Sequence, residues 1–300
     1  MKVTTIKDER RFRIFSLAVM AVIAILCIIP FVLMLSSSFM SESEIALRGY
    51  SFLPKELCLD AYDYLWKKRY TIGACYGLSI FVTVFGTLAN LAITALCAYP
   101  LSRQDFKYRN LFAFLIFFTL LFNGGMTASY IVWTRIFNIK NTIWALLLPN
   151  ALVNAMNILI VRNYYVSNIP YSLIEAAKID GASELRVFVQ IVCPLSVPVF
   201  ATVGLFASIN YWNNWINGMY YITDSKLYTI TIYLNKILND LSALRGGSMM
   251  AEQALLANTS MPASSVRMAV PIIAVLPILL IYPFVQKQLI KGLVVGAVKG

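Results

Sequence analysis

The sequence that decides the fold runs Pro170-Tyr-Ser-Leu-Ile-Glu175-Ala-Ala-Lys-Ile-Asp180-Gly-Ala-Ser-Glu-Leu-Arg-Val-Phe188-Val-Gln-Ile-Val-Cys-Pro194. Ser172 is followed three residues later by Glu175, a capping-box spacing that predicts the start of a short helix. Gly181 supplies a residue that tolerates the left-handed conformation and is expected to end this helix after Asp180. Ser183 can then cap a second short helix. The segment therefore predicts two short helices joined by a sharp turn.

The second predicted helix carries an apolar stripe. Leu185, Phe188, Val189 and Val192 recur at i, i+3, i+4 and i+7, and Pro194 stops the helix. An apolar stripe on a loop has to be covered. Either it packs on the chain's own helix ends or it docks into the groove of a partner, and the spacing alone favours neither.

Six apolar stretches surround this loop. Each lacks Asp, Glu, Lys and Arg and is about 19 residues or longer, enough to cross a hydrocarbon core of roughly 30 Å. They cover residues 14–37, 77–101, 111–134, 141–161, 195–217 and 268–286. With 59% hydrophobic and 13% charged residues, the chain is far more apolar than an ordinary soluble domain. We expect an all-α membrane protein with six transmembrane helices, the first a retained anchor and not a cleaved signal.

Lysine and arginine predict the orientation. They gather before the first stretch, between the second and third, in the loop before the fifth, and after the sixth, which indicates that both termini are cytoplasmic. The predicted division is a cytoplasmic tail (1–13), the first helix with an external loop (14–76), a permease core (77–286) containing the loop helices (171–192), and a cytoplasmic tail (287–300). The net charge of +11 is attributed to this topology and not to nucleic acid, since no basic cluster is interleaved with stacking aromatics.

Composition argues against catalysis. The sequence has no histidine, the commonest general base and metal ligand, and its five cysteines show no CxxC spacing, so neither a zinc site nor a disulfide framework is indicated. It also lacks a GxxxxGK[ST] phosphate-binding motif. We expect a non-catalytic subunit with no metal and no cofactor. The alternatives are a secondary carrier and a membrane-embedded enzyme, but the spans contain none of the ionisable groups on which ion-coupled carriers depend.

Asparagines and tryptophans are the candidates for contact with a solute. Two sets recur at helical spacing and predict polar helix faces, Asn150, Asn154 and Asn157 in one and Asn210, Asn213, Asn214 and Asn217 in the other. Their amides, with aromatic faces such as Trp212 and Trp215, suit a neutral polyhydroxylated solute. The alternative is that the asparagines join helix to helix and the aromatic rings lie at the membrane interface.

The loop resembles a known motif. Glu175-Ala176-Ala177 with Asp180-Gly181-Ala182, Phe188, Ile191 and Pro194 is similar to the EAA loop of ABC importer permeases. In that family the loop forms coupling helices that sit in a cleft of the ATPase subunit, and the resemblance implies the same for residues 171–192. The family's Leu-Pro ending is replaced here by Cys193-Pro194, a departure that leaves the turn intact.

The resemblance extends over most of the chain. It includes Tyr99-Pro100-Leu101-Ser102-Arg103, Trp212-Asn213, Tyr228-Thr229 and the end of the sequence from Lys291, and it is similar to carbohydrate permeases of the maltose-transporter G-subunit type. Gly124-Gly125 and Trp212-Asn213-Asn214-Trp215 look most like the oligosaccharide branch. The resemblance implies a type I importer fold in the bacterial cytoplasmic membrane, with a second homologous permease, two ATPase subunits and an extracytoplasmic solute-binding protein as partners. The expected solute is an oligosaccharide, with a non-sugar solute as the alternative.

Overall fold

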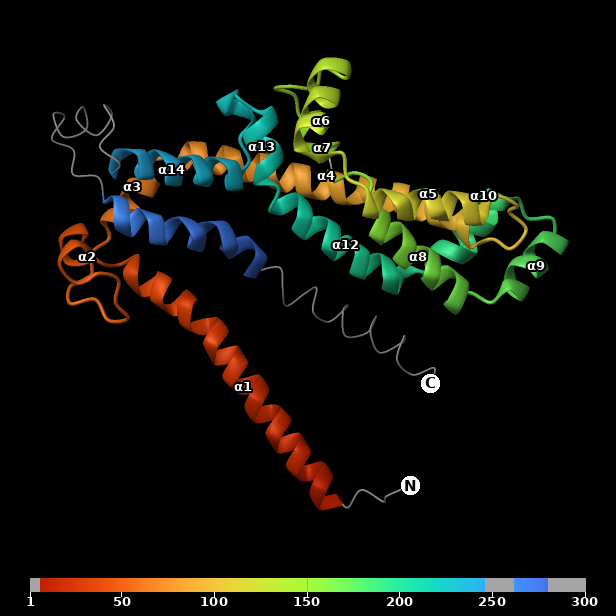
Figure 1. Cartoon of the computed structure of the whole chain (residues 1–300), viewed down its shortest axis with the longest axis horizontal. Helices are drawn as coiled ribbons and strands as arrows, with labels where there is room; N and C mark the ends of the chain where they lie inside the picture. The colour runs from red at the N-terminus through yellow and green to blue at the C-terminus, as the bar shows by residue number, and fades with distance from the viewer. Residues whose placement is uncertain (1–5, 150, 246–261, 280–300) are drawn as a thin grey trace. The chain divides into compact units, whose positions relative to one another are not determined.

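The computed structural model describes residues 6–149, 151–245 and 262–279 of the 300. Within these ranges every regular element is a helix, which agrees with the predicted all-α class (Figure 1). The chain divides into two compact units. The first unit is Met1–Arg69 with Lys236–Leu276, and the second is Tyr70–Asn235 with Pro277–Gly300.

The first unit begins with a long apolar helix. Its elements are α1 (Ile6–Ser37), α2 (Glu42–Arg48), α3 (Asp60–Lys67), the second half of α14 (Ile230–Arg245) and the helix Ala263–Leu279 as far as Leu276. The segment Arg10–Ser37 is long and apolar enough to cross a membrane, and its most apolar stretch has no buried residue. Because water does not stabilise such a surface, lipid or another subunit has to cover it.

The predicted external loop after the first span is folded. Phe39 stacks on Tyr62 with ring centroids 5.0 Å apart, and the Ser38 and Tyr62 hydroxyls lie 2.8 Å from each other. The Ser264 backbone N–H donates to Glu42 Oε2 at 2.7 Å and so ties α2 to the helix Ala263–Leu279. Ala61 and Val266 are also buried in this unit.

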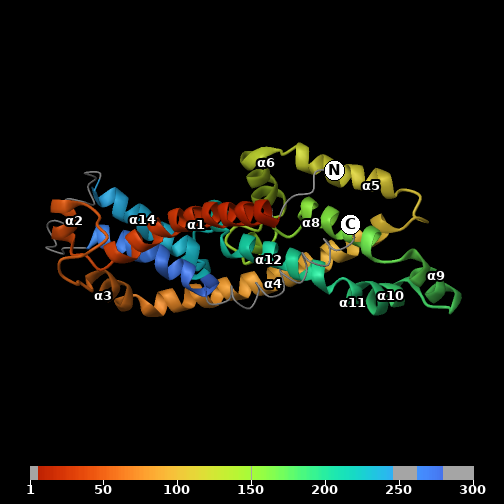
Figure 2. The ribbon, with the colours of Figure 1, turned by 90° about the horizontal axis from the view of Figure 1, so that it is seen from below.

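The second unit holds most of the helices. They are α4 (Arg69–Ser102), α5 (Arg109–Leu121), α6 (Gly125–Ile131), α7 (Trp144–Leu147), α8 (Ala155–Asn168), α9 (Tyr171–Ile179), α10 (Glu184–Val187), α11 (Cys193–Leu195), α12 (Val197–Trp212), α13 (Trp215–Tyr221) and the start of α14, with π-helical turns at Val132–Ile136 and Phe188–Val192 and a 3-10 turn at Ser225–Leu227. α8 packs against both α5 and α12. In Figures 1 and 2, α9 and α10 lie together at one end of this unit.

The predicted spans differ in whether they form one continuous helix. Residues 14–37 and 77–101 lie inside the uninterrupted helices α1 and α4. The stretch 111–134 is bent by 113° between α5 and Gly125–Ile136, and 195–217 belongs to a chain segment bent by 79° between Glu184–Leu195 and Val197–Trp212. Among the described residues, two helices can therefore cross a membrane alone, and up to four spans result if each bent pair counts as one.

The breaks have local causes. Gly125 has a φ of +81°, and its N–H donates to Asn123 Oδ1 at 2.9 Å, so the chain turns sharply before α6. The stretch 141–161 is interrupted between α7 and α8, next to Pro149, which cannot donate a backbone hydrogen bond. Of the last stretch, 268–286, residues up to 279 are helical and the rest lie outside the described residues. A continuous helix is therefore the wrong expectation for the third, fourth and fifth stretches.

A close approach of α4 and α12 lies in an apolar core of the second unit. The Tyr211 ring lies so near Gly86 that a Cβ on Gly86 would be 2.5 Å from the ring Cζ. Tyr211 is buried, and its hydroxyl donates to the Leu147 carbonyl at 3.0 Å, so the ring cannot easily move aside. Val82 and Tyr221 pack in the same core.

The Gly86→Ala substitution is expected to destabilise the purified protein by about 1–3 kcal/mol, because the new methyl group overpacks a fixed ring. The matched control is Gly77→Ala in the same helix, where a Cβ would meet no atom within 4 Å. Thermal unfolding in detergent should show a lower midpoint for Gly86→Ala and an equal or higher midpoint for Gly77→Ala. Equal midpoints for the two variants would contradict this packing.

Candidate functional site

The loop after α8 forms two short helices, as expected, but the first begins differently. α9 starts at Tyr171 with Pro170 at the N-cap and no side-chain cap, so Ser172 lies within the helix. The Leu173 N–H donates to the Pro170 carbonyl at 3.1 Å. The predicted capping box between Ser172 and Glu175 is wrong, because the extended backbone of Pro170 starts the helix before Ser172 can cap it.

The turn between the helices follows the prediction. Gly181 has a φ of +79°, its N–H donates to the Lys178 carbonyl at 3.0 Å, and the Ala182 N–H donates to the Ala177 carbonyl at 2.9 Å. This left-handed ending satisfies the last carbonyls of α9. The Ser183 hydroxyl accepts the Arg186 N–H at 3.4 Å and caps α10. The roles expected of Gly181 and Ser183 in the turn are confirmed.

The second helix is shorter than predicted, and its apolar stripe divides. α10 ends at Val187 and continues as the π-helical turn Phe188–Val192, whose wider winding shifts the side chains that follow. Phe188 and Val192 are buried in the chain's own core. Leu185 is 68% exposed and Val189 54% exposed. Packing on the chain's own core therefore accounts for Phe188 and Val192, and it leaves Leu185 and Val189 uncovered.

The residues of the EAA-like motif occupy several environments. Glu175 and Ala176 are exposed on α9, and Asp180 and Gly181 are exposed in the turn. Ala177 and Ala182 pack partly against the core that buries Phe188, while Pro194 is exposed in α11. Ile179, at the end of α9, is 86% exposed. The loop therefore presents unpartnered apolar side chains beside a polar turn.

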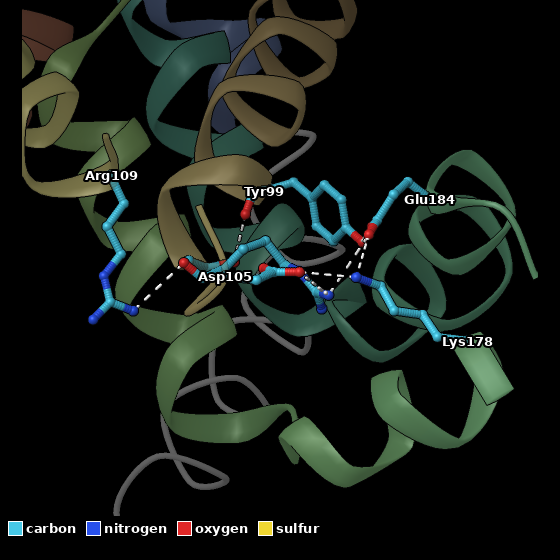
Figure 3. Close-up of polar contacts among 7 residues, drawn as sticks. Tyr99, Asp105, Arg109, Lys178 and Glu184 are labelled. Atoms are coloured by element: carbon cyan, nitrogen blue, oxygen red, sulfur yellow. Dashed lines mark hydrogen bonds and ion pairs between the residues drawn. The ribbon is translucent and has the colours of Figure 1, made fainter. Parts of the chain in front are cut away.

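Five residues from three places in the chain form an ionic cluster at the base of these helices: Tyr99, Arg103, Asp105, Lys178 and Glu184. The Lys178 Nζ lies 2.8 Å from Asp105 Oδ2 and 2.6 Å from Glu184 Oε1. The Tyr99 hydroxyl donates to Glu184 Oε2 at 2.6 Å. Figure 3 shows Lys178 and Glu184 reaching from α9 and α10 toward Tyr99 and Asp105. The cluster joins both short helices to the end of α4.

Arg103 is the buried member of this cluster, only 4% exposed. Its guanidinium lies 3.4 Å from Asp105 and 3.7 Å from Glu184. It also lies over the rings of Tyr99 and Tyr171, with its Cζ 5.6 Å and 5.3 Å from their centroids. In the sequence, Tyr99 and Arg103 belong to the segment of family resemblance, and Arg103 and Lys178 are among the cations that predict the orientation. No local pattern marks Asp105 or the pairing of these residues.

The cluster shifts the pKa values of its members. The hydrogen bond from Lys178 is the main cause of a lowered pKa for Asp105. Burial opposes ionisation of Glu184, but hydrogen bonds from Lys178 and Tyr99 and the charge of Arg103 together lower its pKa. The same bonds to Asp105 and Glu184 raise the pKa of Lys178. All three groups are therefore charged at neutral pH.

Two of the first set of predicted solute-path asparagines make structural contacts. Asn154 is the N-cap of α8, where its Oδ1 accepts the Asn157 N–H at 3.1 Å. Asn157 is buried, and its Nδ2 lies 3.5 Å from Asn90 Oδ1. Asn150 lies outside the described residues. Asn154 therefore lies just before the helix that contains Asn157, and its side chain is used to cap that helix.

The second set is divided by a helix break. α12 ends at Trp212 and α13 begins at Trp215, with Asn213 and Asn214 as the intervening caps. Trp212 is buried against Tyr76, with ring centroids 6.3 Å apart. The predicted single polar face is wrong for this second set, because no single helix carries its members. Asn210, Asn213 and Trp215 remain exposed.

Comparison with known proteins shows similarity over nearly the whole chain. Residues 8–293 match the family described as binding-protein-dependent transport system inner membrane component. Protein LplC of Bacillus subtilis (strain 168) is 39% identical, covering 98% of this chain and 97% of the relative. The polygalacturonan/rhamnogalacturonan transport system permease protein YtcP of the same organism is 36% identical, covering 97% and 99%.

A solved structure is also similar. It is a crystal structure of a bacterial ABC transporter involved in the import of the acidic polysaccharide alginate. The TM-score is 0.79 at 28% sequence identity, and the match covers 96% of this chain and 99% of the matched chain.

Lys178→Met should loosen the two short helices, since it removes both ion pairs of Lys178 and keeps a long side chain. The pairs are partly exposed, so the expected local destabilisation is about 0.4–2 kcal/mol in total. Hydrogen exchange of residues 171–192 measures it. Arg186→Met, which alters an exposed charge of α10, is the control and should leave protection unchanged. Equal protection in both variants would show that the cluster does not hold the helices.

The same protection is expected to depend on pH. Asp105 and Glu184 have lowered pKa values, so their contribution is present above the ordinary carboxyl pKa of about 4 and is lost as the pH falls through the lowered values. After correction for intrinsic exchange, protection of residues 171–192 should fall below about pH 4 in the unaltered protein. The Lys178→Met variant should show a weaker dependence, and an identical profile would contradict the assignment.

Proposed function

Because this chain belongs to the family of inner membrane components of binding-protein-dependent transport systems, we propose that it is a transmembrane permease subunit of an ATP-driven importer for a carbohydrate, specifically an oligosaccharide. The observation that carries this proposal is the end-to-end similarity to YtcP, whose name specifies polygalacturonan and rhamnogalacturonan transport. The similarity to a structure involved in alginate import points to the same class of solute. ATP hydrolysis then belongs to a partner subunit.

The proposed topology has six spans with both termini in the cytoplasm. Residues 1–13 and 287–300 are the tails, 14–76 the first span with its folded external segment, and 77–286 the permease core. The distribution of lysine and arginine supports this orientation. The broken helices fit it, since irregular backbone is tolerated within a membrane where protein covers it. In this arrangement α9 and α10 lie on the cytoplasmic side.

Residues 171–192 are proposed to seat in a cleft of the ATPase. The exposed Ile179, Leu185 and Val189 supply an apolar contact, and the exposed Glu175 and Asp180 supply its polar edge. The ionic cluster fixes both helices to the end of α4, so a displacement imposed on them would reach a spanning helix as a rigid movement. Phe188, with Ala177 and Ala182 packed nearby, anchors the loop to the core.

The solute path is proposed to lie between this subunit and a second homologous permease, with two ATPase subunits below and a solute-binding protein outside. Asn210, Asn213 and Trp215 are its candidate contacts, since they are exposed around the break between α12 and α13. The exposed amides offer donors and acceptors for hydroxyl groups, and the indole offers a face for a sugar ring. The other described candidates make structural contacts: Asn154 and Asn214 cap α8 and α13, Asn157 contacts Asn90, and Trp212 packs against Tyr76.

The first test identifies the complex and its solute. We expect affinity purification of the chain from its native membrane in mild detergent to recover a second permease, an ATPase and a binding protein. The recovered binding protein is then titrated with neutral and acidic oligosaccharides and with amino acids. Binding of an oligosaccharide is the expected result. Recovery of the folded chain alone would favour a secondary carrier, and binding of amino acids only would favour a non-sugar importer.

The coupling assignment is tested with Leu185→Asp. A carboxylate at this exposed position leaves the fold intact but places a charge in an apolar interface, so co-purification of the ATPase should fall about tenfold or more. Leu47→Asp is the matched control, since Leu47 is 85% exposed on α2 of the first unit. Normal ATPase recovery with Leu185→Asp would refute docking through this surface.

A further inference from the structure

A polar cavity of about 410 Å³ lies beside the ionic cluster. Its wall comes from the end of α4, the start of α5, the second half of α8 and the start of α9. Nothing in the proposed transport mechanism uses it.

The charges on the cavity wall have one sign. Arg103, Arg109 and Arg162 line it, and no Asp or Glu is among its lining residues. Arg103 is offset by Asp105 and Glu184, but among the described residues neither Arg109 nor Arg162 forms an ion pair. The potential inside the cavity is therefore positive, and screening is weaker than on an open surface.

Backbone carbonyls position the guanidinium groups of Arg109 and Arg162. Arg109 Nη1 donates to the Arg103 carbonyl at 3.4 Å, and Arg162 Nε donates to the Leu101 carbonyl at 3.2 Å. Arg162 Nη1 also donates to Asn163 Oδ1 at 3.3 Å. Figure 3 shows Arg109 on the opposite side of Asp105 from Lys178 and Glu184. Each guanidinium keeps further N–H groups for a ligand, since arginine has five donors.

The wall also contains donors without a partner. Tyr165 is 3% exposed, and its hydroxyl forms no hydrogen bond within the part of the chain that the structure describes. Arg103 Nη1 is likewise buried without a hydrogen-bond partner there. Both residues line the cavity, and a buried donor left unsatisfied is unfavourable, so a small side-chain shift that brings either donor to an acceptor oxygen of a ligand would relieve this cost.

Two helices begin at the cavity. α5 starts at Arg109 after Tyr108 and α9 starts at Tyr171 after Pro170, and neither N-terminus has a side-chain cap. The free N–H groups and the positive ends of both helix dipoles favour an anion at this place.

We propose that this cavity binds a phosphoryl group, as the headgroup of an anionic phospholipid or as inorganic phosphate. Guanidinium groups match the oxygens of phosphate in geometry and charge, and the wall offers donors without a competing carboxylate. In the proposed topology this end of α4 and α8 lies at the cytoplasmic leaflet, where basic pockets between helices meet lipid headgroups. The binding itself does not depend on the transported solute. An occupant would bridge α5, α8 and the first turn of α9.

The test is native mass spectrometry of the delipidated complex, titrated with phosphatidylglycerol, phosphatidylcholine or inorganic phosphate. We expect phosphatidylglycerol to bind and phosphatidylcholine to be released. The double substitution Arg109→Gln with Arg162→Gln should weaken binding about tenfold or more, because charge-assisted hydrogen bonds are lost. Lys107→Gln is the matched control, since Lys107 is an exposed cation of the same loop that does not line the cavity. Its affinity should equal that of the unaltered protein.

A milder variant covers the case in which the double substitution does not fold. Tyr165→Phe removes one unpartnered oxygen and keeps the packing of the ring, so it should weaken binding several-fold without lowering the thermal midpoint. Inorganic phosphate that binds alone and displaces the lipid would identify a soluble ligand, and phosphatidylglycerol that binds without such competition would identify a lipid site. Equal binding by all variants, or no binding of either probe, would overturn the proposal. Failure of phosphoryl binding is not expected to change the recovery of the ATPase. ATPase recovery therefore tests the transport assignment separately.

Discussion

Carbonyl groups at a broken helix need hydrogen-bond donors from within the protein, since lipid offers none, and this constraint governs the second unit. At the break between α7 and α8, side chains donate to the carbonyls of Leu147, Pro149, Ala151 and Leu152. Tyr211 donates to the first at 3.0 Å and Asn217 to the second at 2.7 Å. Asn90 donates to the last two at 2.9 Å and 3.0 Å. Side chains from α4, α12 and α13 thus replace the missing helical bonds.

The position of the candidate coupling site depends on this support. α8 runs from the satisfied break to the turn before α9, so the break determines where α9 begins. At the far end the ionic cluster joins α9 and α10 to α4. The hydrogen bonds at the break and the ionic cluster are therefore connected by α4 and α8. These two helices pack in a common apolar core, which includes Ala98, Val161 and Tyr165. A movement of the short helices has a rigid route into that core.

The sequence predicts those features that depend on near neighbours. Apolar length alone marks α1 and α4, and Gly181 and Ser183 mark the turn between α9 and α10 because their backbone roles are local. Helical periodicity misleads where the helix is not continuous, which is why Asn210, Asn213, Asn214 and Asn217 do not form one face. The stripe from Leu185 divides at a π-helical turn for the same reason. The ionic cluster joins Asp105 to Lys178, 73 residues apart, and no local pattern reports such a pairing.

Lys178 contacts two carboxylates that belong to different segments, one in the loop after α4 and one in α10. A change at Lys178 therefore disturbs two pairings at once, and a change at either carboxylate still leaves a cation bound to the other. Substitution at these positions is tolerated most easily when all three vary in concert. Over evolutionary time Asp105, Lys178 and Glu184 should be inherited as one unit, and their joint variation would record which helices have to stay together in this protein.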